Sequence, residues 1–377
     1  MTPILPGSTL GILGGGQLGR MVAMAARSFG YRVQVMDPDP SCPARFVVDA
    51  CFEGAWDDIQ AAANLARGSD VVTLEIEQVS LASLEAAAQH APVRPSADLL
   101  RVIQDRILQK EWLARNGFPL GPWRAVRSER DLVDAAPALG GRCFVKAAQG
   151  GYDGRSQVKL RSGGPMTPAD AWRQLGQKPC VIEQALGLEL EISVMVARSP
   201  RGETKSFPSA TNHHENQILA WSVIPSLVSP DIEARAQKLA CEIADQFTLE
   251  GLLAVEMFLT QSGDLLVNEL APRPHNSYHA SERACVTSQF EQCVRAVCDL
   301  PLGDTSVVQP AAIANLLGDL WLDHAPRFDQ ALAVPGVRVH LYEKHQPRKG
   351  RKMGHLSAVG ATPQQAVEWV LEAQKRL

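Results

Sequence analysis

The chain has 377 residues, of which 45% are hydrophobic and 21% charged, and its formal net charge is -4. One hydrophobic core seldom serves so long a chain, so two or three domains are expected. This slightly negative net charge gives no overall excess of basic residues of the kind that attracts nucleic acid or an anionic membrane. No apolar stretch could span a bilayer and the first residues do not resemble a signal peptide. The eight cysteines form no C-x-x-C pair, which indicates a reduced, cytoplasmic protein.

The first hundred residues alternate strands and helices. Strands are expected at 9–13, 32–36 and 70–74, and helices at 17–29, 57–66 and 81–88. This pattern predicts a parallel sheet covered on both faces, with a ligand crevice at the carboxyl ends of its strands.

A glycine turn follows the first expected strand. Gly14, Gly16 and Gly19 satisfy G-x-G-x-x-G, and Asp37 ends the second strand where a ribose-binding carboxylate would lie. Such a turn can bind a dinucleotide or any other phosphate, or it can simply allow tight packing of strand on helix. Because the chain offers no obvious hydride-transfer site, a sugar phosphate fits as well as NAD.

Two carboxylates, Glu75 and Glu77, stand two residues apart beyond the third strand. In an extended segment both point the same way, toward the crevice. One of the two carboxylates could help to cap the N-terminus of a helix, and Glu77 is the expected substrate contact.

The middle of the chain has a different character. A long amphipathic helix is expected at 98–115, followed by short strands at 144–146, 157–160, 181–184, 191–196 and 218–225 and a helix at 230–247. This reads as a mixed, largely antiparallel α+β domain. Strands at 311–316 and 337–342 and a helix at 363–375 form a smaller C-terminal part.

A glycine-rich segment, Gly150-Gly151-Tyr152-Asp153-Gly154-Arg155, follows a strand that ends in Lys146. It could fold over nucleotide phosphates, with Lys146 and Arg155 supplying charge.

A hairpin places two acidic residues opposite each other. If Ser262-Gly263 is a two-residue turn, Glu256 pairs with Glu269 and their Cβ atoms lie ~5 Å apart, where like charges destabilise a sheet. A bound cation is the simplest explanation, and Mg²⁺ takes one or two carboxylates and completes its shell with water and phosphates. A register slip of one residue would instead send Glu269 to the other face.

Other charged groups have competing interpretations. Arg106 and Lys110, one turn apart, are typical of a solvated basic face, and the adjacent His213 and His214 would point apart on a strand, which disfavours zinc. The basic run Lys344, Arg348, Lys349, Arg351 and Lys352 is either a solvated loop or, as we favour, an anion clamp.

Several segments together resemble 5-(carboxyamino)imidazole ribonucleotide synthases of purine biosynthesis. They are Gly14-Gly15-Gly16-Gln17-Leu18-Gly19-Arg20-Met21, residues 150–155, residues 268–277, Thr287-Ser288-Gln289-Phe290-Glu291-Gln292 and Gly350-Arg351-Lys352-Met353-Gly354-His355. The resemblance runs nearly end to end. It implies an ATP-grasp fold of α/β and α+β type, with an N-terminal parallel-sheet (pre-ATP-grasp) domain at 1–97, an ATP-grasp domain at 98–300 and a small C-terminal domain at 301–377.

The resemblance also implies that the chain is an ATP-dependent ligase with the following reaction. ATP phosphorylates bicarbonate to carboxyphosphate, and the amine of 5-aminoimidazole ribonucleotide captures it or the carbon dioxide that it releases. A homodimer is implied as well. A related ATP-grasp ligase for formate or another carboxylate, and a nucleotide sensor without turnover, are the alternatives.

The residues that the resemblance assigns fall into four groups. Nucleotide contacts are Arg106, Lys146, Gly151, Gly154, Glu183, Leu186, Glu191, His214, Asn268 and Glu269. Magnesium ligands are Glu256 and Glu269. Residues around the reacting bicarbonate and amine are Tyr152, Asp153, Arg155, Arg273, His275 and Asn276. Ribonucleotide contacts are Gln17, Leu18, Glu77, Lys344, Arg351 and Lys352.

Three positions depart from the pattern. Ser156, Tyr278 and Glu343 stand where glycine is usual in the family. None of these changes removes a charged group from the implied chemistry.

Overall fold

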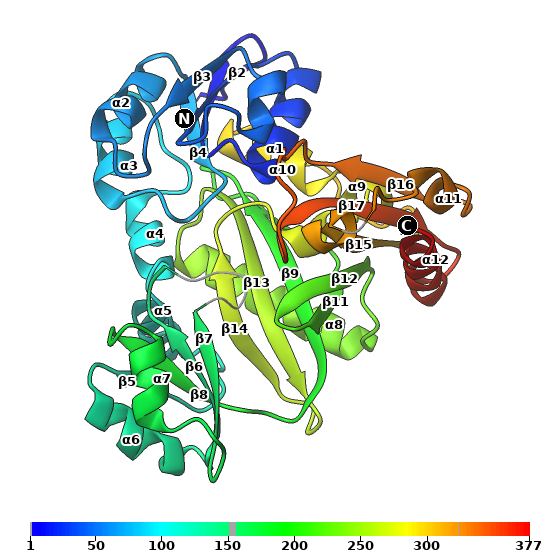
Figure 1. Ribbon diagram of the computed structural model, residues 1–377. Coiled ribbons are helices and arrows are strands. Elements are labelled where there is room, and N and C mark those ends of the chain that lie inside the picture. The colour runs from blue at the N-terminus through cyan, green and yellow to red at the C-terminus, as the bar shows by residue number, and fades with distance from the viewer. Residues whose placement is uncertain (1, 151–155, 323) are drawn as a thin grey trace.

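The computed structural model describes residues 2–150, 156–322 and 324–377. Its N-terminal part is a four-stranded parallel sheet in the order β3-β2-β1-β4, with helices on its faces (Figure 1). The elements are β1 (Thr9–Leu13), α1 (Gln17–Ser28), β2 (Arg32–Asp37), the 3-10 turn Pro43–Val47, β3 (Ala50–Glu53), α2 (Ile59–Arg67), β4 (Val71–Leu74) and α3 (Leu81–Ala88). The expected parallel sheet is confirmed, although the short edge strand β3 was not predicted.

The single helix expected at 98–115 is wrong. Two helices, α4 (Ala97–Ile103) and α5 (Arg106–Arg115), are separated by Gln104 and Asp105. The Asp105 carboxylate accepts the amides of Ile107 and Leu108 and so starts a new helix at Arg106. This break places Arg106 in the first turn of α5.

Below this link lies a four-stranded antiparallel sheet in the order β5-β8-β6-β7 (Figure 1). Helices α6 and α7 bury Leu132 and Trp172 in a core shared with Val145 and Ile182. The two helices were not predicted, although both start with capping boxes, Ser128 with Asp131 and Thr167 with Asp170. The elements are β5 (Trp123–Val126), α6 (Glu129–Ala138), β6 (Arg142–Ala147), β7 (Gln157–Arg161), α7 (Pro168–Gln174) and β8 (Cys180–Gln184).

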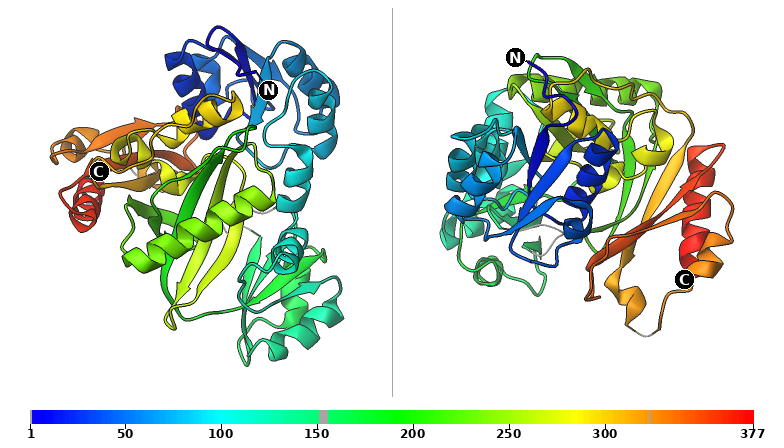
Figure 2. Two further views of the ribbon diagram at one scale, coloured as in Figure 1. Left: turned by 180° about the vertical axis from the view of Figure 1, so that it is seen from behind. Right: turned by 90° about the horizontal axis from the view of Figure 1, so that it is seen from above.

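A large antiparallel sheet forms the centre of the molecule. Its strand order is β14-β13-β9-β11-β12-β15-β17-β16, and β10 pairs with β9. Helix α8 lies across one face of this sheet, where Ala240 and Ile243 pack against Ile192 and Leu253 (Figure 2). The strands are β9 (Leu188–Arg198), β10 (Thr204–Ser206), β11 (Ala210–Glu215), β12 (Ile218–Ile224), β13 (Gly251–Thr260), β14 (Leu265–Ala271), β15 (Ala311–Leu317), β16 (Arg338–Leu341) and β17 (Lys352–Val359).

The C-terminal strands continue this same sheet, because β12 pairs with β15. Strand β17 was not predicted; its first residue, Lys352, is the last of the basic run, which the sequence analysis interpreted as a solvated loop or, preferably, an anion clamp. The remaining helices are α8 (Pro230–Gln246), Asn276–Tyr278 (3-10), α9 (Ser281–Ala284), α10 (Gln289–Val297), Gly318–Trp321 (3-10), α11 (Phe328–Leu332) and α12 (Pro363–Lys375). None of the helices in the described part of the chain is long and apolar enough to cross a membrane.

Candidate active site

A cavity of 1370 Å³ lies between the two antiparallel sheets and extends to the N-terminal sheet. Most of the predicted site residues line it. From the described residues these are Gln17, Leu18, Glu77, Arg106, Lys146, Glu183, Leu186, Glu191, His214, Glu256, Asn268, Glu269, Arg273, His275, Asn276 and Lys352. Lys344 and Arg351 are not part of the lining. Gly151, Tyr152, Asp153, Gly154 and Arg155 lie outside the described residues.

The predicted pairing of Glu256 with Glu269 is confirmed, but the turn that should produce it is wrong. Three residues, Gln261 to Gly263, join the strands, because the Thr260 amide donates to the Asp264 carbonyl. A longer turn alone would shift the register, and a bulge at Asn268 shifts it back. Asn268 and Glu269 therefore both oppose Glu256.

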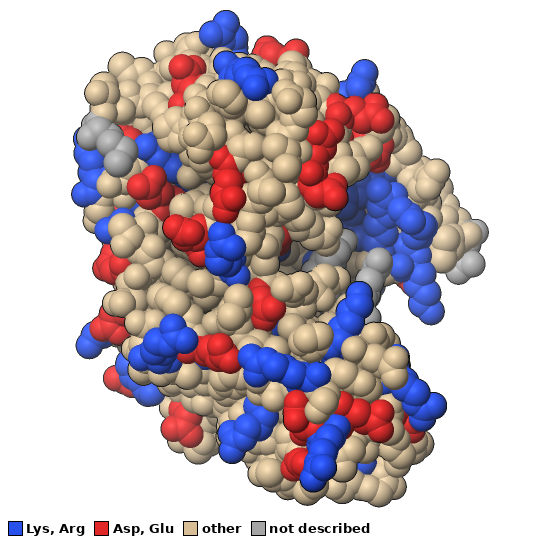
Figure 3. All heavy atoms as spheres, turned by 90° about the vertical axis from the view of Figure 1, so that its left-hand side faces the viewer, with Lys and Arg blue, Asp and Glu red and all other residues tan. Residues whose placement is uncertain are grey.

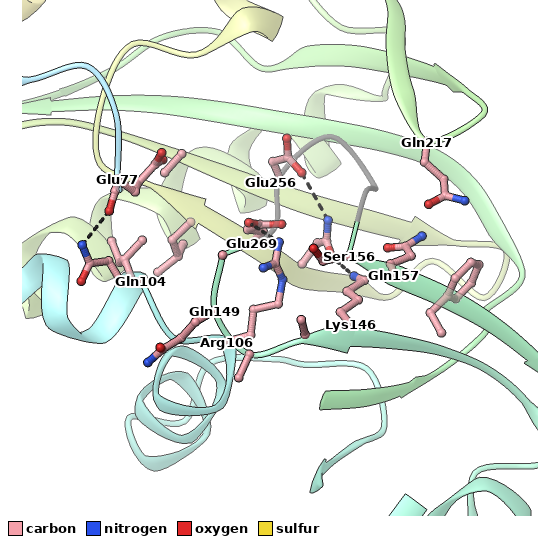
Figure 4. A pocket seen from close by; sticks show the side chains of 18 of the residues that line it. Glu77, Gln104, Arg106, Lys146, Gln149, Ser156, Gln157, Gln217, Glu256 and Glu269 are labelled. Atoms are coloured by element: carbon pink, nitrogen blue, oxygen red, sulfur yellow. Dashed lines mark hydrogen bonds and ion pairs between the residues drawn. The ribbon is translucent and has the colours of Figure 1, made fainter. Parts of the chain in front are cut away.

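The two facing carboxylates have cationic and amide neighbours (Figure 4). Arg106 Nη2 lies 2.9 Å from Glu269 Oε1, and Asn268 Nδ2 donates to Glu256 Oε2 at 3.2 Å. Lys146 reaches Asn268 Oδ1 at 3.4 Å from the opposite sheet. Charge repulsion between the glutamates is thus reduced by the protein itself.

The electrostatics of Glu256 still leave room for a cation. Burial raises the pKa of Glu256; the positive charge of His214 opposes the rise, and the carboxylates of Glu269 and Glu191 add to it. These oxygen donors, with the amide of Asn268, match the ligands that Mg²⁺ prefers. The donor set therefore fits a magnesium ion.

A buried charge triad stands beside this pair. Glu183 on β8 accepts from Lys110 and from Lys146, each at 2.6 Å. Burial raises the pKa of Glu183, but the charges of Lys146 and Lys110 outweigh it and lower the pKa to about 2. The interpretation of Arg106 and Lys110 as a solvated face is wrong, because Lys110 is 5% exposed and Arg106 is held by Glu269.

The adjacent histidines of β11 have different surroundings. His214 Nδ1 lies 2.7 Å from Glu191 on β9, whereas the exposed His213 stacks on Trp221. A β-bulge separates them in the sheet register.

A second group of polar residues lines the end of the cavity near the N-terminal sheet. Arg273 Nε lies 2.8 Å from Glu77, so this pair joins the two domains. His275 is partly buried, and both loss of water and the charge of Arg273 hold its pKa well below the usual range, so the imidazole is neutral. Asn276 lines the cavity, and neither of its buried amide atoms has a hydrogen-bond partner among the residues that the structure describes. An unpartnered amide of this kind needs a polar ligand.

The glycine turn is largely filled by the protein itself. Asp37 accepts the Gly15 amide at 2.7 Å, and Glu75 accepts the amides of Gly16 and Gly19 at 2.9 Å each. Asp37 is therefore a structural residue and not a ribose contact, and the dinucleotide interpretation is wrong. Gln17 and Leu18, the first residues of α1, line the cavity, and the amides of a helix's first turn have no partner within the helix.

The basic run meets the N-terminal domain at the rim of the cavity. Glu343 pairs with Arg20 at 2.7 Å, and His345 packs edge-on against Phe46. The φ of Glu343 is 56°, a backbone conformation that favours glycine, which explains why glycine is usual there. Lysine and arginine side chains gather at the rim of the hollow shown in Figure 3.

The sequence analysis named Lys110 and Glu75 but missed their roles. Lys110 lies four residues after Arg106, on the same face of a helix, which was the available signal. Glu75 was seen, but its role in filling the glycine turn depends on the packing of β4 beside β1.

Comparisons with known proteins cover nearly the whole chain. Residues 8–104 match the ribonucleotide synthetase preATP-grasp domain, residues 111–290 the ATP-grasp domain, and residues 311–368 the phosphoribosylaminoimidazole carboxylase C-terminal domain. The chain is 39% identical to N5-carboxyaminoimidazole ribonucleotide synthase of Bacillus subtilis, over 98% of this chain and 95% of that protein. It is 40% identical to the protein of the same name from Brucella melitensis, over 95% and 98%.

Solved structures agree. The N5-carboxyaminoimidazole synthetase of Staphylococcus aureus complexed with ADP has a TM-score of 0.92 and 32% identity, covering 99% of this chain and 98% of that one. The synthase of Aspergillus clavatus in complex with ADP and 5-aminoimidazole ribonucleotide has a TM-score of 0.88 and 30% identity, covering 98% and 99%. The expected ATP-grasp fold is confirmed.

Proposed function

The chain belongs to the N5-carboxyaminoimidazole ribonucleotide synthase family, ATP-grasp ligases of purine biosynthesis, and we propose that its cavity carboxylates 5-aminoimidazole ribonucleotide with bicarbonate and ATP. The observation that carries the proposal is that one cavity contains two distinct sets of polar groups. The Glu256–Glu269 pair and the Lys110–Glu183–Lys146 triad lie between the antiparallel sheets, and the second set lies beside the N-terminal sheet.

The first set suits a nucleotide. Lys146 and Arg106 point toward the carboxylate pair from the small sheet and from α5, where they can contact phosphates (Figure 4). Glu256 and Glu269 would hold Mg²⁺, which when bound neutralises charge on the phosphates during transfer. Glu183 pairs with both lysines and fixes where their ammonium groups lie.

The second set suits bicarbonate and the ribonucleotide. Arg273 supplies positive charge and donors in a fixed fork, and Asn276 offers an amide that no other described residue engages. The amides of Gln17 and Leu18, together with Lys352, can bind the ribonucleotide phosphate. Lys344 and Arg351 stand at the rim, so they would reach this phosphate only on closure of the cavity.

The reaction then has two balanced steps. A bicarbonate oxygen attacks the γ-phosphorus of ATP, which gives carboxyphosphate and ADP. The exocyclic amine attacks the carboxyl carbon, or carbon dioxide released from it, so that the new N–C bond replaces the C–O bond to phosphate and the amine gives up one proton. Carboxyphosphate hydrolyses readily, and exclusion of water is the expected role of the segment 150–155.

Steady-state phosphate release with each candidate acceptor tests the proposal. Release that requires both 5-aminoimidazole ribonucleotide and bicarbonate supports it. Release with formate or another carboxylate in place of bicarbonate would indicate a different ligase, and release that no acceptor stimulates would indicate a nucleotide sensor. A homodimer and a cytoplasmic location remain predictions, which sedimentation and cell fractionation would test.

A further inference from the structure

Three potential metal ligands meet outside the cavity lining, on the C-terminal extension of the large sheet. His340 on β16 and His355 on β17 are directly paired across the two strands, and Glu282 on α9 lies over them. One atom from each side chain, a ring nitrogen or a carboxylate oxygen, lies within 4.8 Å of the others. Directly paired residues point to the same face of a sheet, so the pairing brings both imidazoles to one place.

We propose that Glu282, His340 and His355 bind a divalent transition-metal ion of the zinc class, separate from the magnesium pair Glu256 and Glu269 and beyond the proposed reaction. Imidazole nitrogen with one carboxylate suits Zn²⁺, whereas Mg²⁺ prefers oxygen alone. The exposed position of Glu282 leaves one side open for a water molecule as the fourth ligand.

The spacing is close to what zinc needs. Tetrahedral ligands at ~2.0–2.1 Å from zinc lie roughly 3.4 Å from one another. The three atoms therefore need to approach by at most about 1.4 Å. Glu282 is exposed on a four-residue helix, so its side chain can supply this movement.

A hydrogen bond to one ring nitrogen of His355 leaves the other nitrogen available for a metal. Its Nδ1 hydrogen-bonds with the buried Tyr342 hydroxyl at 2.8 Å, which leaves Nε2 for a metal. A ligating histidine usually has such a partner on its other nitrogen, because it fixes the ring orientation. His355 also stacks with both His279 and His340, with ring centroids 4.8 and 5.0 Å away, so a shared ion requires the half-buried His340 ring to turn out of its stack.

Zinc titration by calorimetry, in buffer with excess Mg²⁺ and no nucleotide, tests the proposal. The excess Mg²⁺ occupies the carboxylate pair of the cavity. Wild type should bind one Zn²⁺, and H340Q and E282Q should each lose at least roughly a hundredfold in affinity. Tyr342→Phe should lose roughly tenfold to a hundredfold, because only the partner of His355 is removed. His90→Gln, a change at an exposed histidine elsewhere, should bind as wild type does.

Cobalt spectroscopy then identifies the ligands, because the cysteines Cys42 and Cys51, with sulfurs 3.9 Å apart, are the competing site. The proposed site predicts visible Co²⁺ bands without a thiolate charge-transfer band. A thiolate band, unchanged zinc affinity in both H340Q and E282Q with native circular dichroism, or no stoichiometric zinc binding by wild type would each overturn the proposal. Because His340 and Glu282 are not fully buried, neither variant should disturb the fold.

Discussion

Replacing Glu183 by glutamine should destabilise the protein more than any ordinary surface substitution. The carboxylate is 13% exposed and lies 2.6 Å from both Lys110 and Lys146. Its pKa falls from 4.5 to about 2, and this shift corresponds to about 3 kcal/mol of stabilisation. The variant would also leave the buried ammonium group of Lys110 and the half-buried one of Lys146 without this counter-charge, and breaking a buried pair costs ~3–5 kcal/mol.

The two lysines do not share this cost equally. Burial lowers the pKa of Lys110 in spite of the attraction of Glu183, so Lys110 loses its proton most easily when the carboxylate is removed. This neutralisation limits the penalty, and we expect about 3 kcal/mol at pH 7. Unfolding entropy of about 2.1 cal/mol/K per residue gives about 0.8 kcal/mol/K for 377 residues, so Tm should fall by about 4 °C if the chain unfolds as one unit.

Circular dichroism melts of wild type, Glu183→Gln and Glu189→Gln would test this estimate. Glu189 is an exposed glutamate on β9, the next strand along the chain, and controls for the loss of one negative charge. The pKa of Glu183 is lowered on folding, so its stabilisation is complete above about pH 4.5 and disappears as pH falls toward 2. The Tm difference should therefore be constant from pH 5 to 7 and shrink at lower pH. A Tm for Glu183→Gln that equals that of Glu189→Gln would refute the reasoning.

Three further variants probe other parts of the account. Glu269→Gln should lower kcat roughly hundredfold to thousandfold at saturating Mg²⁺ and ATP, as measured by phosphate release, because a proposed magnesium ligand is lost. Arg351→Ala should raise the KM for the ribonucleotide roughly tenfold to a hundredfold and leave the KM for ATP nearly unchanged, since a charge-assisted phosphate contact contributes ~1.5–3 kcal/mol. Tyr278→Phe should lower stability in urea unfolding by about 1–3 kcal/mol, because the hydroxyl donates to the buried carbonyls of Ser193 and Pro208 at 2.8 and 2.9 Å.

Each of these has a result that would count against it. Normal kcat in Glu269→Gln would remove Glu269 from the metal site. Equal losses for both substrates in Arg351→Ala would move the basic run to the nucleotide, and no loss would make it a solvated loop; Lys349→Ala, at an exposed lysine of the same run, is the matched control. Unchanged unfolding of Tyr278→Phe would mean that water satisfies the two carbonyls.

Local pattern was enough to predict the parallel N-terminal sheet and the pairing of Glu256 with Glu269. The pairing was right in spite of a wrong turn length, because the bulge at Asn268 offsets the extra turn residue. The alternation of polar and apolar residues shows neither the extra turn residue nor the bulge that offsets it.

Contacts between distant segments were harder to predict. The burial of Lys110 depends on Glu183, 73 residues away on another element, so a helix read in isolation shows only a basic face. The glycine pattern by itself predicts that the backbone amides bind a phosphate. In the structure the carboxylate of Glu75, which follows β4, accepts two of these amides instead. The break between α4 and α5 was readable in principle, because Asp105 is a good N-cap residue.

The central claim is that ATP activates bicarbonate in this cavity before the amine is carboxylated. It is tested most directly by supplying ¹⁸O-labelled bicarbonate with ATP, Mg²⁺ and 5-aminoimidazole ribonucleotide and determining the mass of the phosphate released. Attack of a bicarbonate oxygen on the γ-phosphorus predicts one ¹⁸O atom in each phosphate formed by coupled turnover. Phosphate without label, released at the same rate whether or not bicarbonate is present, would contradict the account.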